Sequence, residues 1–376
     1  MTQSKVKYGF NTADKEHMTA CIVPTYRASR TILSVVTSAI PHVDLVVVVD
    51  DACPEGSAAL VEKAFSSNPN VITIRHATNA GVGAAFKTGA QAAMRLGYDF
   101  IVKIDADAQM DPSVIPEMVA VLKNSPLVAL VKGNRFYESA VLQKMPRRRL
   151  IGNSALTLLV RTASGYWASI DPTNGFLAIR ASYLKKIDTK DLENRYFFET
   201  SLLCALGIRR APITEMDIPA IYASEVSSMS ITTVLWTFPL KLIKAFTRRF
   251  AWQYIVADMN IGTIFFGVGM ILEIVATALG TYWWHDALTK GIPKSPGTVG
   301  LVFVPLFIGF QLLLSWILYD VQHGGDVMKT QSKSSQEGRE SESWKSIVTI
   351  QNDTEKTKLQ TKTVKRKNPQ KEKTQN

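Results

Sequence analysis

Four short apolar runs near the start of the chain alternate with segments of helical spacing, and this alternation limits the fold more than any other feature. The runs are TACIV ending at Val23, LVVVV from Leu45, VITI from Val71 and FIVKI from Phe100. Runs that are apolar throughout and rich in β-branched residues are typical of strands covered on both faces of a parallel sheet. The segments between them, Ser29 to Ile40, Ser57 to Phe65 and Gly83 to Leu96, have the spacing of helices. The alternation predicts an α/β domain with a doubly wound, mainly parallel sheet.

Polar residues follow the predicted strands in order along the chain. They are Pro24 and Thr25, Asp50 and Asp51, Asn79, and then Asp105 and Asp107. In open α/β sheets the ligand crevice lies outside the carboxyl ends of the strands, so one site could collect all of them. Each also has a plainer interpretation, with Asp50 and Asp51 as helix caps and Asn79 and Gly81 in a turn. Because each of them stands at a strand end, we favour one shared site over a purely structural role for all of them.

The sequence IDADAQ gives the sharpest chemical signal. Asp105 and Asp107 stand two residues apart directly after an apolar run. Residues two apart in an extended segment point the same way, so both carboxylates can face one ion. A hard cation such as Mg²⁺ or Mn²⁺ bound there would bridge the phosphates of a nucleoside diphosphate and offset charge on the leaving group. The sequence therefore predicts a divalent-metal site at this strand end.

Two apolar segments, Ile261 to Trp284 and Val299 to Tyr319, are predicted to be membrane spans. Each exceeds the roughly 20 residues that a helix needs to cross a bilayer. Positive charge is richer on the outer sides of the pair than in the loop between the segments. By the positive-inside rule, we expect an integral, multi-pass membrane protein whose N-terminal domain and tail are cytoplasmic. Glu273, within the first span, is expected to be protonated or turned toward a neighbouring helix.

Basic residues flank both sides of this apolar region. Residues 231–256 place Leu, Trp, Phe and Ile between Lys241, Lys244, Arg248 and Arg249. This pattern is expected of a helix in the membrane interface, although an amphipathic core helix has the same spacing. From residue 329 the chain is too polar to build a core. We expect a disordered tail there that is attracted to anionic lipid.

Charge and cysteine content complete the predicted organisation. Much of the formal net charge of +11 falls in the tail and in two clusters, residues 147–149 and 241–249, which points to lipid headgroups and phosphates and not to nucleic acid. The three scattered cysteines fit a reducing compartment, and no secretory signal is expected. The predicted parts are an N-terminal extension (1–17), the α/β domain (18–230), amphipathic interface helices (231–258), two transmembrane helices (259–320) and a basic, disordered cytoplasmic tail (321–376).

A series of short motifs resembles the family-two glycosyltransferases with the GT-A fold, a Rossmann-like domain that binds nucleotide-sugars. In order, the motifs are IVPTYRAS, VVDDACPEG, NAGVGAAFKTGA, DADAQMDP, KGNRF, DPTNGFLAIR and the stretch from YFFETSLL to SSMS. Within that family, the chain is similar to the polyprenyl-phosphate glycosyltransferases of the dolichol-phosphate mannose synthase type. The likeness runs from Thr19 to about Ile231. Its specificity lies in the order and spacing of the motifs.

The resemblance implies roles for residues at each motif. Nucleotide-sugar binding would fall to Pro24, Thr25, Tyr26, Asp50, Asp51, Asn79, Gly81, Lys87, Asp105 and Arg135. Metal and diphosphate would be held by Asp105, Asp107 and Gln109. Glu199 is placed in the site without a role in proton transfer, since a lipid phosphate is already ionised at neutral pH and needs no base.

The acceptor side departs from the family's pattern. The arginine and lysine that flank the family's late serine motif are absent around Ser227 and Ser228, and Cys53 or its neighbours replace a usual serine. The acceptor phosphate must then find another partner, and we expect Arg147, Arg148 and Arg149 to bind it together with Ser227 and Ser228, because guanidinium groups suit bidentate phosphate binding. These arginines would otherwise serve only to attract anionic lipid.

The resemblance implies an inverting transfer of a hexose from a UDP- or GDP-linked donor to undecaprenyl or dolichyl phosphate, on the cytoplasmic face. Transfer to a lipid-linked saccharide or another glycan hydroxyl, or an inactive membrane scaffold, are the alternatives. A dinucleotide-binding oxidoreductase is excluded because PTYRAS stands where a G-x-G-x-x-G turn is needed. A processive polysaccharide synthase is disfavoured because the chain has no Q-x-x-R-W motif. Homo-oligomers are expected to form through the spans.

Overall fold

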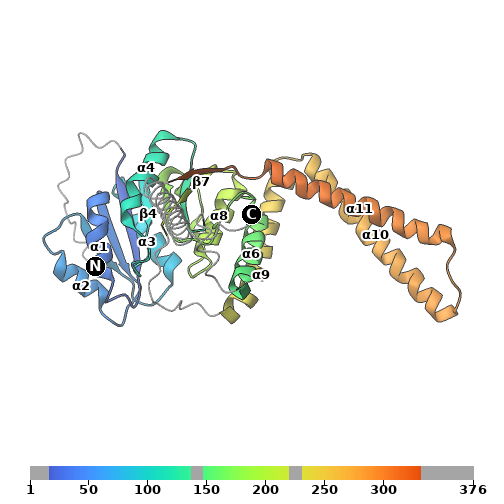
Figure 1. The fold of residues 1–376 in the computed structure, drawn as a ribbon, viewed down its shortest axis with the longest axis horizontal. Helices are drawn as coiled ribbons and strands as arrows, with labels where there is room; N and C mark the ends of the chain where they lie inside the picture. The colour runs from blue at the N-terminus through green and yellow to red at the C-terminus, as the bar shows by residue number, and fades with distance from the viewer. Residues whose placement is uncertain (1–16, 137–146, 220–230, 332–376) are drawn as a thin grey trace, which may run out of the picture.

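The computed structural model describes residues 17–136, 147–219 and 231–331. An α/β body carries a long helical hairpin that projects from one end (Figure 1). The strands are β1 (Thr19–Thr25), β2 (Leu45–Asp50), β3 (Val71–Arg75), β4 (Phe100–Lys103), β5 (Leu130–Asn134), β6 (Leu177–Arg180), β7 (Ile213–Asp217) and β8 (Val327–Gln331). They form one sheet in the order β3-β2-β1-β4-β6-β5-β7-β8. The predicted α/β fold with a mainly parallel sheet is confirmed.

Strands β1 to β4 follow the four apolar runs, and helices follow the segments between them. These helices are α1 (Ile32–Ala39), α2 (Ser57–Ala64) and α3 (Val82–Arg95). Successive residues of β1 point to opposite faces of the sheet: Ala20 and Ile22 enter one buried cluster, and Cys21 and Val23 enter the other. A strand buried on both faces needs apolar residues at every position, which explains the uninterrupted runs.

In the second half of the body, strand β6 runs opposite to its neighbours. β6 pairs antiparallel with both β4 and β5, whereas the remaining neighbours are parallel. Its helices are α4 (Ile115–Asn124), α6 (Arg147–Ser164), α7 (Ala181–Leu184) and α8 (Phe198–Ile208), with short turns η1 (Ile40–His42), η2 (Pro112–Val114) and η3 (Thr189–Asp191). The reversal at β6 brings the loop before it, which contains Gly175, next to the end of β4.

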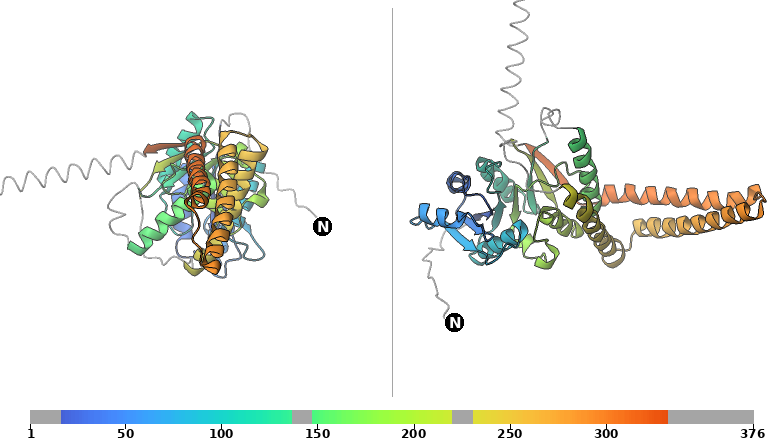
Figure 2. Two further views of the ribbon diagram at one scale, coloured as in Figure 1. Left: turned by 90° about the vertical axis from the view of Figure 1, so that its right-hand side faces the viewer. Right: turned by 90° about the horizontal axis from the view of Figure 1, so that it is seen from below.

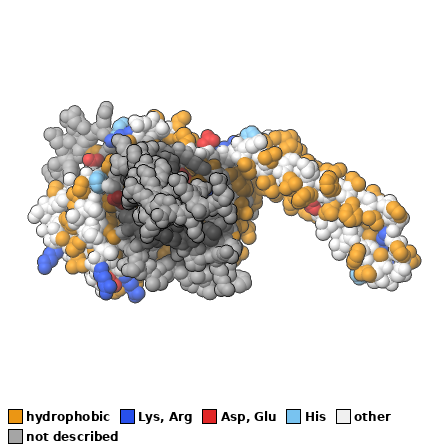
Figure 3. All heavy atoms as spheres, in the orientation of Figure 1, with side chains coloured by type: hydrophobic (Ala, Val, Ile, Leu, Met, Phe, Trp, Pro, Cys, Tyr) orange, Lys and Arg blue, Asp and Glu red, His pale blue; other side chains and the backbone are white. Residues whose placement is uncertain are grey.

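Two helices, α10 (Ile261–Lys290) and α11 (Pro296–His323), form the projecting hairpin (Figure 2). Both are long and apolar enough to cross a membrane, so the two predicted segments are helices that are candidate membrane spans. Asn260 caps the start of α10 together with Thr263, and Gly291 ends it in the left-handed region. Large apolar side chains stand exposed along the hairpin, as the space-filling view shows (Figure 3). In water this surface would be costly, so it fits a lipid environment.

Glu273 of α10 lies against α11. A Cβ built on Gly309 of α11 would be 3.1 Å from the Oε1 atom of Glu273, and that oxygen has no hydrogen-bond partner within the described part of the chain. The position agrees with a carboxyl turned toward a neighbouring helix, which keeps it away from lipid on that side.

Helix α9 (Ile231–Phe250) continues into the π-helical turn η4 (Ala251–Val256). The helix packs against α6 and α8 of the body. Lys241 pairs with Glu193 at 2.7 Å, Arg248 pairs with Asp191, and Arg249 is fully buried. Each of these three basic side chains therefore has an acidic partner, the one of Arg249 being Asp320, and the position of the helix in the membrane interface stays a prediction. Exposed apolar side chains on the same element, including those at 240, 243, 252 and 255, keep bilayer contact a prediction.

Asp320 of α11 ties the hairpin to the body. It is buried and accepts hydrogen bonds from Arg249 Nη1 at 2.8 Å and Nη2 at 2.9 Å, from the Tyr254 hydroxyl at 2.7 Å and from Trp167 Nε1 at 2.8 Å. Arg249 also donates to the carbonyl oxygen of Thr162 in α6. One carboxylate therefore joins α11, the α9–η4 segment and the loop after α6.

The chain returns to the sheet after the hairpin. Residues 327–331 form β8, which pairs in parallel with β7 from Ile213↔Val327 to Asp217↔Gln331. The prediction of a disordered tail from residue 321 was wrong for this stretch, because backbone pairing to an open sheet edge does not require apolar side chains. Gly325 is needed here, since a Cβ would lie 2.1 Å from the Tyr166 ring. Residues 332–376 lie outside the described part.

Candidate active site

The carboxyl ends of β1, β2 and β4 bring the predicted polar residues to one edge of the sheet. Thr25 stands beside Asp50 in the β1–β2 register. Pro24 and Thr25 are buried, so a ligand could contact mainly their backbone atoms. Tyr26, by contrast, is 43% exposed. Asp105 and Asp107 lie in the turn that follows β4. The structure therefore brings the predicted nucleotide-sugar residues of three strands to one region.

Asp50 and Asp51 hold the loops of this region. Asp50 accepts from the backbone nitrogen atoms of Cys53 at 2.7 Å and Ala58 at 3.3 Å, which closes the turn into α2. Asp51 accepts from the backbone nitrogens of Ala80 and Gly81 and contacts a ring nitrogen of His76 at 2.8 Å. Both carboxylates are buried and hold these loops through backbone hydrogen bonds. A direct role in nucleoside binding stays a prediction.

The glycine-rich segment after β3 forms a packing surface. Gly81 is buried with φ +102°, and a Cβ there would be 2.4 Å from the backbone oxygen of Asn194. At Gly83 a Cβ would be 2.3 Å from the backbone oxygen of Glu193. Asn79, by contrast, is exposed. These glycines allow the loop before α8 to lie on the start of α3, so the pattern does not require a phosphate to explain it.

Lys87 secures the same loop. Its ammonium donates to Asn194 Oδ1 at 2.5 Å, to the backbone oxygen of Leu192 at 2.9 Å and to that of Thr189 at 3.3 Å. Burial lowers the pKa of Lys87 below its ordinary value, and the nearby Glu193 carboxylate opposes this effect. All three ammonium donors have protein acceptors, so the predicted contact with the sugar-phosphate region would require one of these bonds to open.

Next to Asp105 lies a buried lysine that sequence reasoning missed. The Lys103 ammonium is 2.5 Å from Asp105 Oδ1 and 3.1 Å from Glu199 Oε1, and its side chain has no exposed surface. Burial alone would lower the pKa of Lys103, but the Asp105 and Glu199 carboxylates raise it above its ordinary value. The signal was a charged residue inside the run FIVKI, whose neighbours are all apolar. A buried charge must be paired, so this lysine indicated buried acids.

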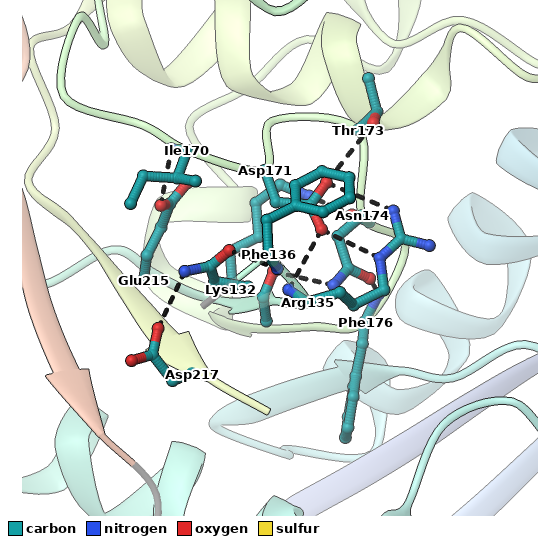
Figure 4. A network of polar contacts seen from close by, with 12 residues as sticks. Lys132, Arg135, Phe136, Ile170, Asp171, Thr173, Asn174, Phe176, Glu215 and Asp217 are labelled. Atoms are coloured by element: carbon teal, nitrogen blue, oxygen red, sulfur yellow. Dashed lines mark hydrogen bonds and ion pairs between the residues drawn. The ribbon is translucent and has the colours of Figure 1, made fainter. Parts of the chain in front are cut away.

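A second buried lysine lies in a polar network under the site (Figure 4). Lys132 of β5 donates to the carbonyl oxygen of Asn174, and burial lowers its pKa to about 8 despite the carboxylates around it. Arg135 Nε lies 2.9 Å from the buried Asp171. Glu215 accepts from Ser169 and from the backbone nitrogen of Ile170, and burial raises its pKa. The loop 169–174 is thereby fixed to β5 and β7.

This loop also reaches the hairpin. Trp167, which precedes residues 169–174, donates to Asp320, while Gly175, which follows them, lies against the β4 turn. A Cβ on Gly175 would be 2.8 Å from Asp105 Oδ2 and 2.9 Å from the Lys103 ammonium. A residue with a Cβ at this position would force one of these two side chains to move. Residues 165–175 therefore connect the base of the hairpin to the candidate active site.

Asp105 and Asp107 at the β4 turn are residue types that suit a divalent ion, and the metal site itself stays a prediction. The Asp105 side chain is 34% exposed, and Asp107 Oδ1 accepts from the backbone nitrogen of Gln109 at 3.0 Å. No three His, Cys, Asp or Glu side chains within residues 17–136, 147–219 and 231–331 come together as a complete metal cage. Mg²⁺ commonly binds one or two carboxylates and takes its other ligands from phosphates and water. Two carboxylates that leave the remaining positions to substrate agree with that coordination.

The predicted acceptor residues are placed less completely. Arg147, Arg148 and Arg149 form the first residues of α6, at the end of that helix away from Trp167. Ser227 and Ser228 lie outside the described residues. The structure therefore leaves acceptor binding by these five residues as a prediction.

Comparison with known proteins matches this arrangement to one family. The sequence model of "Glycosyl transferase family 2" matches residues 20–188. The polyprenol monophosphomannose synthase of Mycolicibacterium smegmatis is 30% identical over 189 residues, which cover 49% of this chain and 70% of that protein. The undecaprenyl-phosphate mannosyltransferase of Micrococcus luteus is 29% identical over 205 residues, covering 52% of this chain and 82% of the relative.

A third relative carries a different sugar in its name. The UDP-N-acetylglucosamine–dolichyl-phosphate N-acetylglucosaminyltransferase of Methanococcus voltae is 28% identical over 232 residues, covering 58% of this chain and 91% of that protein. Residues 20–188, which the family model matches, fall on the α/β body and include the β4 turn with its two aspartates. The chain belongs to glycosyl transferase family 2, and its α/β body is a GT-A-like domain.

Proposed function

We propose that this chain transfers a hexose from a nucleotide-sugar to the phosphate of a membrane polyprenyl phosphate, such as undecaprenyl or dolichyl phosphate. The observation that carries the proposal is the attachment of the site to two candidate spans through Asp320 and the loop 165–175. Such an attachment would hold the sugar donor at the depth of a lipid headgroup. The names of the three relatives, each of which contains a polyprenol or polyprenyl phosphate, support the same acceptor.

In the proposed reaction, an oxygen of the acceptor phosphate attacks C1 of the sugar from the face opposite the nucleoside diphosphate. A bond forms between that oxygen and C1, and the bond from C1 to the diphosphate oxygen breaks, so its electron pair leaves with the diphosphate and the configuration at C1 inverts. When bound, a divalent ion would offset the charge on the leaving diphosphate. Asp105 and Asp107 are the residues that would hold it, with Gln109 fixing Asp107 through its backbone nitrogen.

Glu199 is suited to this acceptor because of its partner. Its Oε1 lies 3.1 Å from the buried Lys103 ammonium, so this oxygen already has a charged partner within the protein and is not free to take a proton from a hydroxyl. A sugar hydroxyl would need a base, whereas a phosphate oxygen carries its charge at neutral pH. The contact therefore favours a phosphate acceptor over the alternative of a glycan hydroxyl.

The proposal extends to orientation and to the acceptor contacts. The distribution of Lys and Arg around the spans supports a cytoplasmic catalytic domain and tail. Arg147, Arg148 and Arg149 remain our choice for the acceptor phosphate, with the tail beyond residue 331 helping to hold the enzyme at anionic lipid. The donor is UDP- or GDP-linked, and the relatives name both mannose and N-acetylglucosamine.

Mass spectrometry of lipids tests the proposed function. Membranes that contain the chain are incubated with a panel of UDP- and GDP-sugars, Mn²⁺ and polyprenyl phosphate, and matched membranes contain the Asp107→Asn variant. We expect one donor to give a lipid heavier than polyprenyl phosphate by one hexose-class unit, only with the parent chain. A product built on a lipid-linked saccharide would show that this saccharide, and not polyprenyl phosphate, is the acceptor. The absence of both transfer and donor hydrolysis would favour the inactive scaffold.

The closeness of Gly175 to the β4 turn gives a local prediction. Gly175→Ala is expected to lower turnover by about tenfold or more, because the added Cβ would displace Asp105 or Lys103 and small displacements of site groups are costly. Gly152→Ala is the control, since nothing lies within 4 Å of a Cβ there. Initial rates with saturating donor measure both. Equal rates for the two variants would show that the turn tolerates the displacement.

A further inference from the structure

Lys103 holds two acids that come from separate parts of the chain. Asp105 follows β4, and Glu199 is in the first turn of α8. The lysine ammonium is 2.5 Å from the first carboxylate, 3.1 Å from the second and 3.4 Å from the carbonyl oxygen of Gly175. An ammonium has three donors, and all three are directed at these oxygens. The donor side of the site and α8 are therefore joined at one buried nitrogen.

The charges of this group leave little attraction for a second cation. With Lys103 charged, the three side chains together carry a net charge of minus one. A divalent ion held by Asp105 would lie close to the ammonium, and like charges at short range weaken one another's binding to a shared carboxylate. Asp107 would supply the other carboxylate, and the described residues contain no group of three or more His, Cys, Asp or Glu side chains that could hold a metal ion. The free chain should hold the ion weakly.

We propose that Lys103 is a positioning residue that fixes Asp105 and Glu199 on one ammonium and keeps the metal affinity of the free chain low, so that the ion enters together with the nucleotide diphosphate. The lysine lowers metal affinity by its charge while it improves the placement of the acid that binds the metal. Removing it should have opposite effects on binding and turnover. The turnover part of the proposal rests on the proposed function, and the metal-affinity part does not.

Charge-matched variants test the affinity part. Lys103→Met leaves a net charge of minus two on the group, Glu199→Gln leaves zero, and the double variant restores minus one. Mn²⁺ binding to the full chain in detergent is measured by electron paramagnetic resonance without nucleotide. We expect Lys103→Met to bind Mn²⁺ about tenfold more tightly than the parent, because one neighbouring charge changes the affinity of a carboxylate for a proton by roughly one to three powers of ten and should act on a bound cation in the same direction. The double variant should return to within about threefold of the parent, and Glu199→Gln should bind less tightly than the parent.

A lysine that only supports the fold would give a different order. If Lys103 merely shapes the turn, its loss disorders Asp105, and Mn²⁺ affinity falls in Lys103→Met and falls again in the double variant. That order, or equal affinities in all four proteins, overturns the proposal. Glu199→Gln keeps the ammonium and Asp105 in place, so its weaker binding remains informative should Lys103→Met fail to fold, and unchanged or tighter binding in that variant would overturn the proposal by itself.

Turnover separates this inference from the proposed function. In transfer assays, Lys103→Met should need less Mn²⁺ for half-maximal rate and should show a lower kcat, because Asp105 and Glu199 lose their common anchor. Higher Mn²⁺ affinity without any transfer by the parent chain would retain the role of Lys103 and reject the proposed function. If the parent chain transfers hexose but Lys103→Met binds Mn²⁺ no more tightly than the parent, the proposed function is kept and the role of Lys103 is rejected.

Discussion

Asp107→Asn is expected to lower hexose transfer by at least about a hundredfold while the fold stays intact, because the variant removes a charge that a hard cation requires. The turn should survive, since an asparagine Oδ1 can accept from the Gln109 backbone nitrogen as the aspartate does at 3.0 Å. Asp105→Asn is expected to be similarly slow. Steady-state rates over a Mn²⁺ titration measure the loss.

The matched control for this charge removal is Asp188→Asn. Asp188 is exposed and caps η3 by accepting from the Lys190 backbone nitrogen, which asparagine also does. Its rate should equal that of the parent. Full turnover by either Asp105→Asn or Asp107→Asn, together with indifference to a chelator, would reject the metal assignment.

The largest effect on stability is expected at Asp320. Asp320→Ala leaves the fully buried Arg249 guanidinium without its carboxylate, and breaking a buried pair by removing one partner costs about 3–5 kcal/mol. We expect the Tm of the detergent-solubilised chain to fall by roughly 10 °C. Thermal unfolding followed by near-ultraviolet circular dichroism reports the change through Trp167 and Tyr254, which both contact this acid.

Two further variants control the size of that effect. Arg248→Met breaks a pair whose arginine side chain is 54% exposed, so it should cost less than about 1 kcal/mol. Arg249→Met combined with Asp320→Leu removes both charges and should recover much of the loss, because an apolar pair leaves no buried charge unpaired. If Asp320→Ala melted like Arg248→Met, the network would not be what holds the hairpin to the body.

The sequence predicted the parts of the fold that depend on local patterns. Strands β1 to β4 follow from β-branched runs, and the two spans follow from length and hydropathy. The antiparallel strand β6 and the pairing of β8 with β7 were missed because strand order and direction are set by contacts distant in sequence. The amphipathic pattern of α9 was read correctly as helical, but the pattern contains no information on which acid each basic residue meets.

The candidate site divides in a similar way. Asp105, Asp107 and Asp50 were recognised because they lie at or just after the ends of strands, where a crevice is expected. Lys103 and Lys132 lie inside strands, and a charged residue in a buried strand has meaning only when its partners are known. The resemblance placed Lys87 at the sugar phosphate. In the structure its ammonium donates hydrogen bonds to the loop before α8.

The late position of β8 has a consequence for how the protein is made. Synthesis proceeds from the N-terminus, and domains generally fold as units as they emerge. Here the last strand of the catalytic sheet follows α10 and α11 in the chain, so the edge of β7 stays open until both hairpin helices have left the ribosome. Insertion of the hairpin into the bilayer would then precede closure of the sheet edge, and a nascent chain that fails to insert would expose both an apolar hairpin and an unpaired strand.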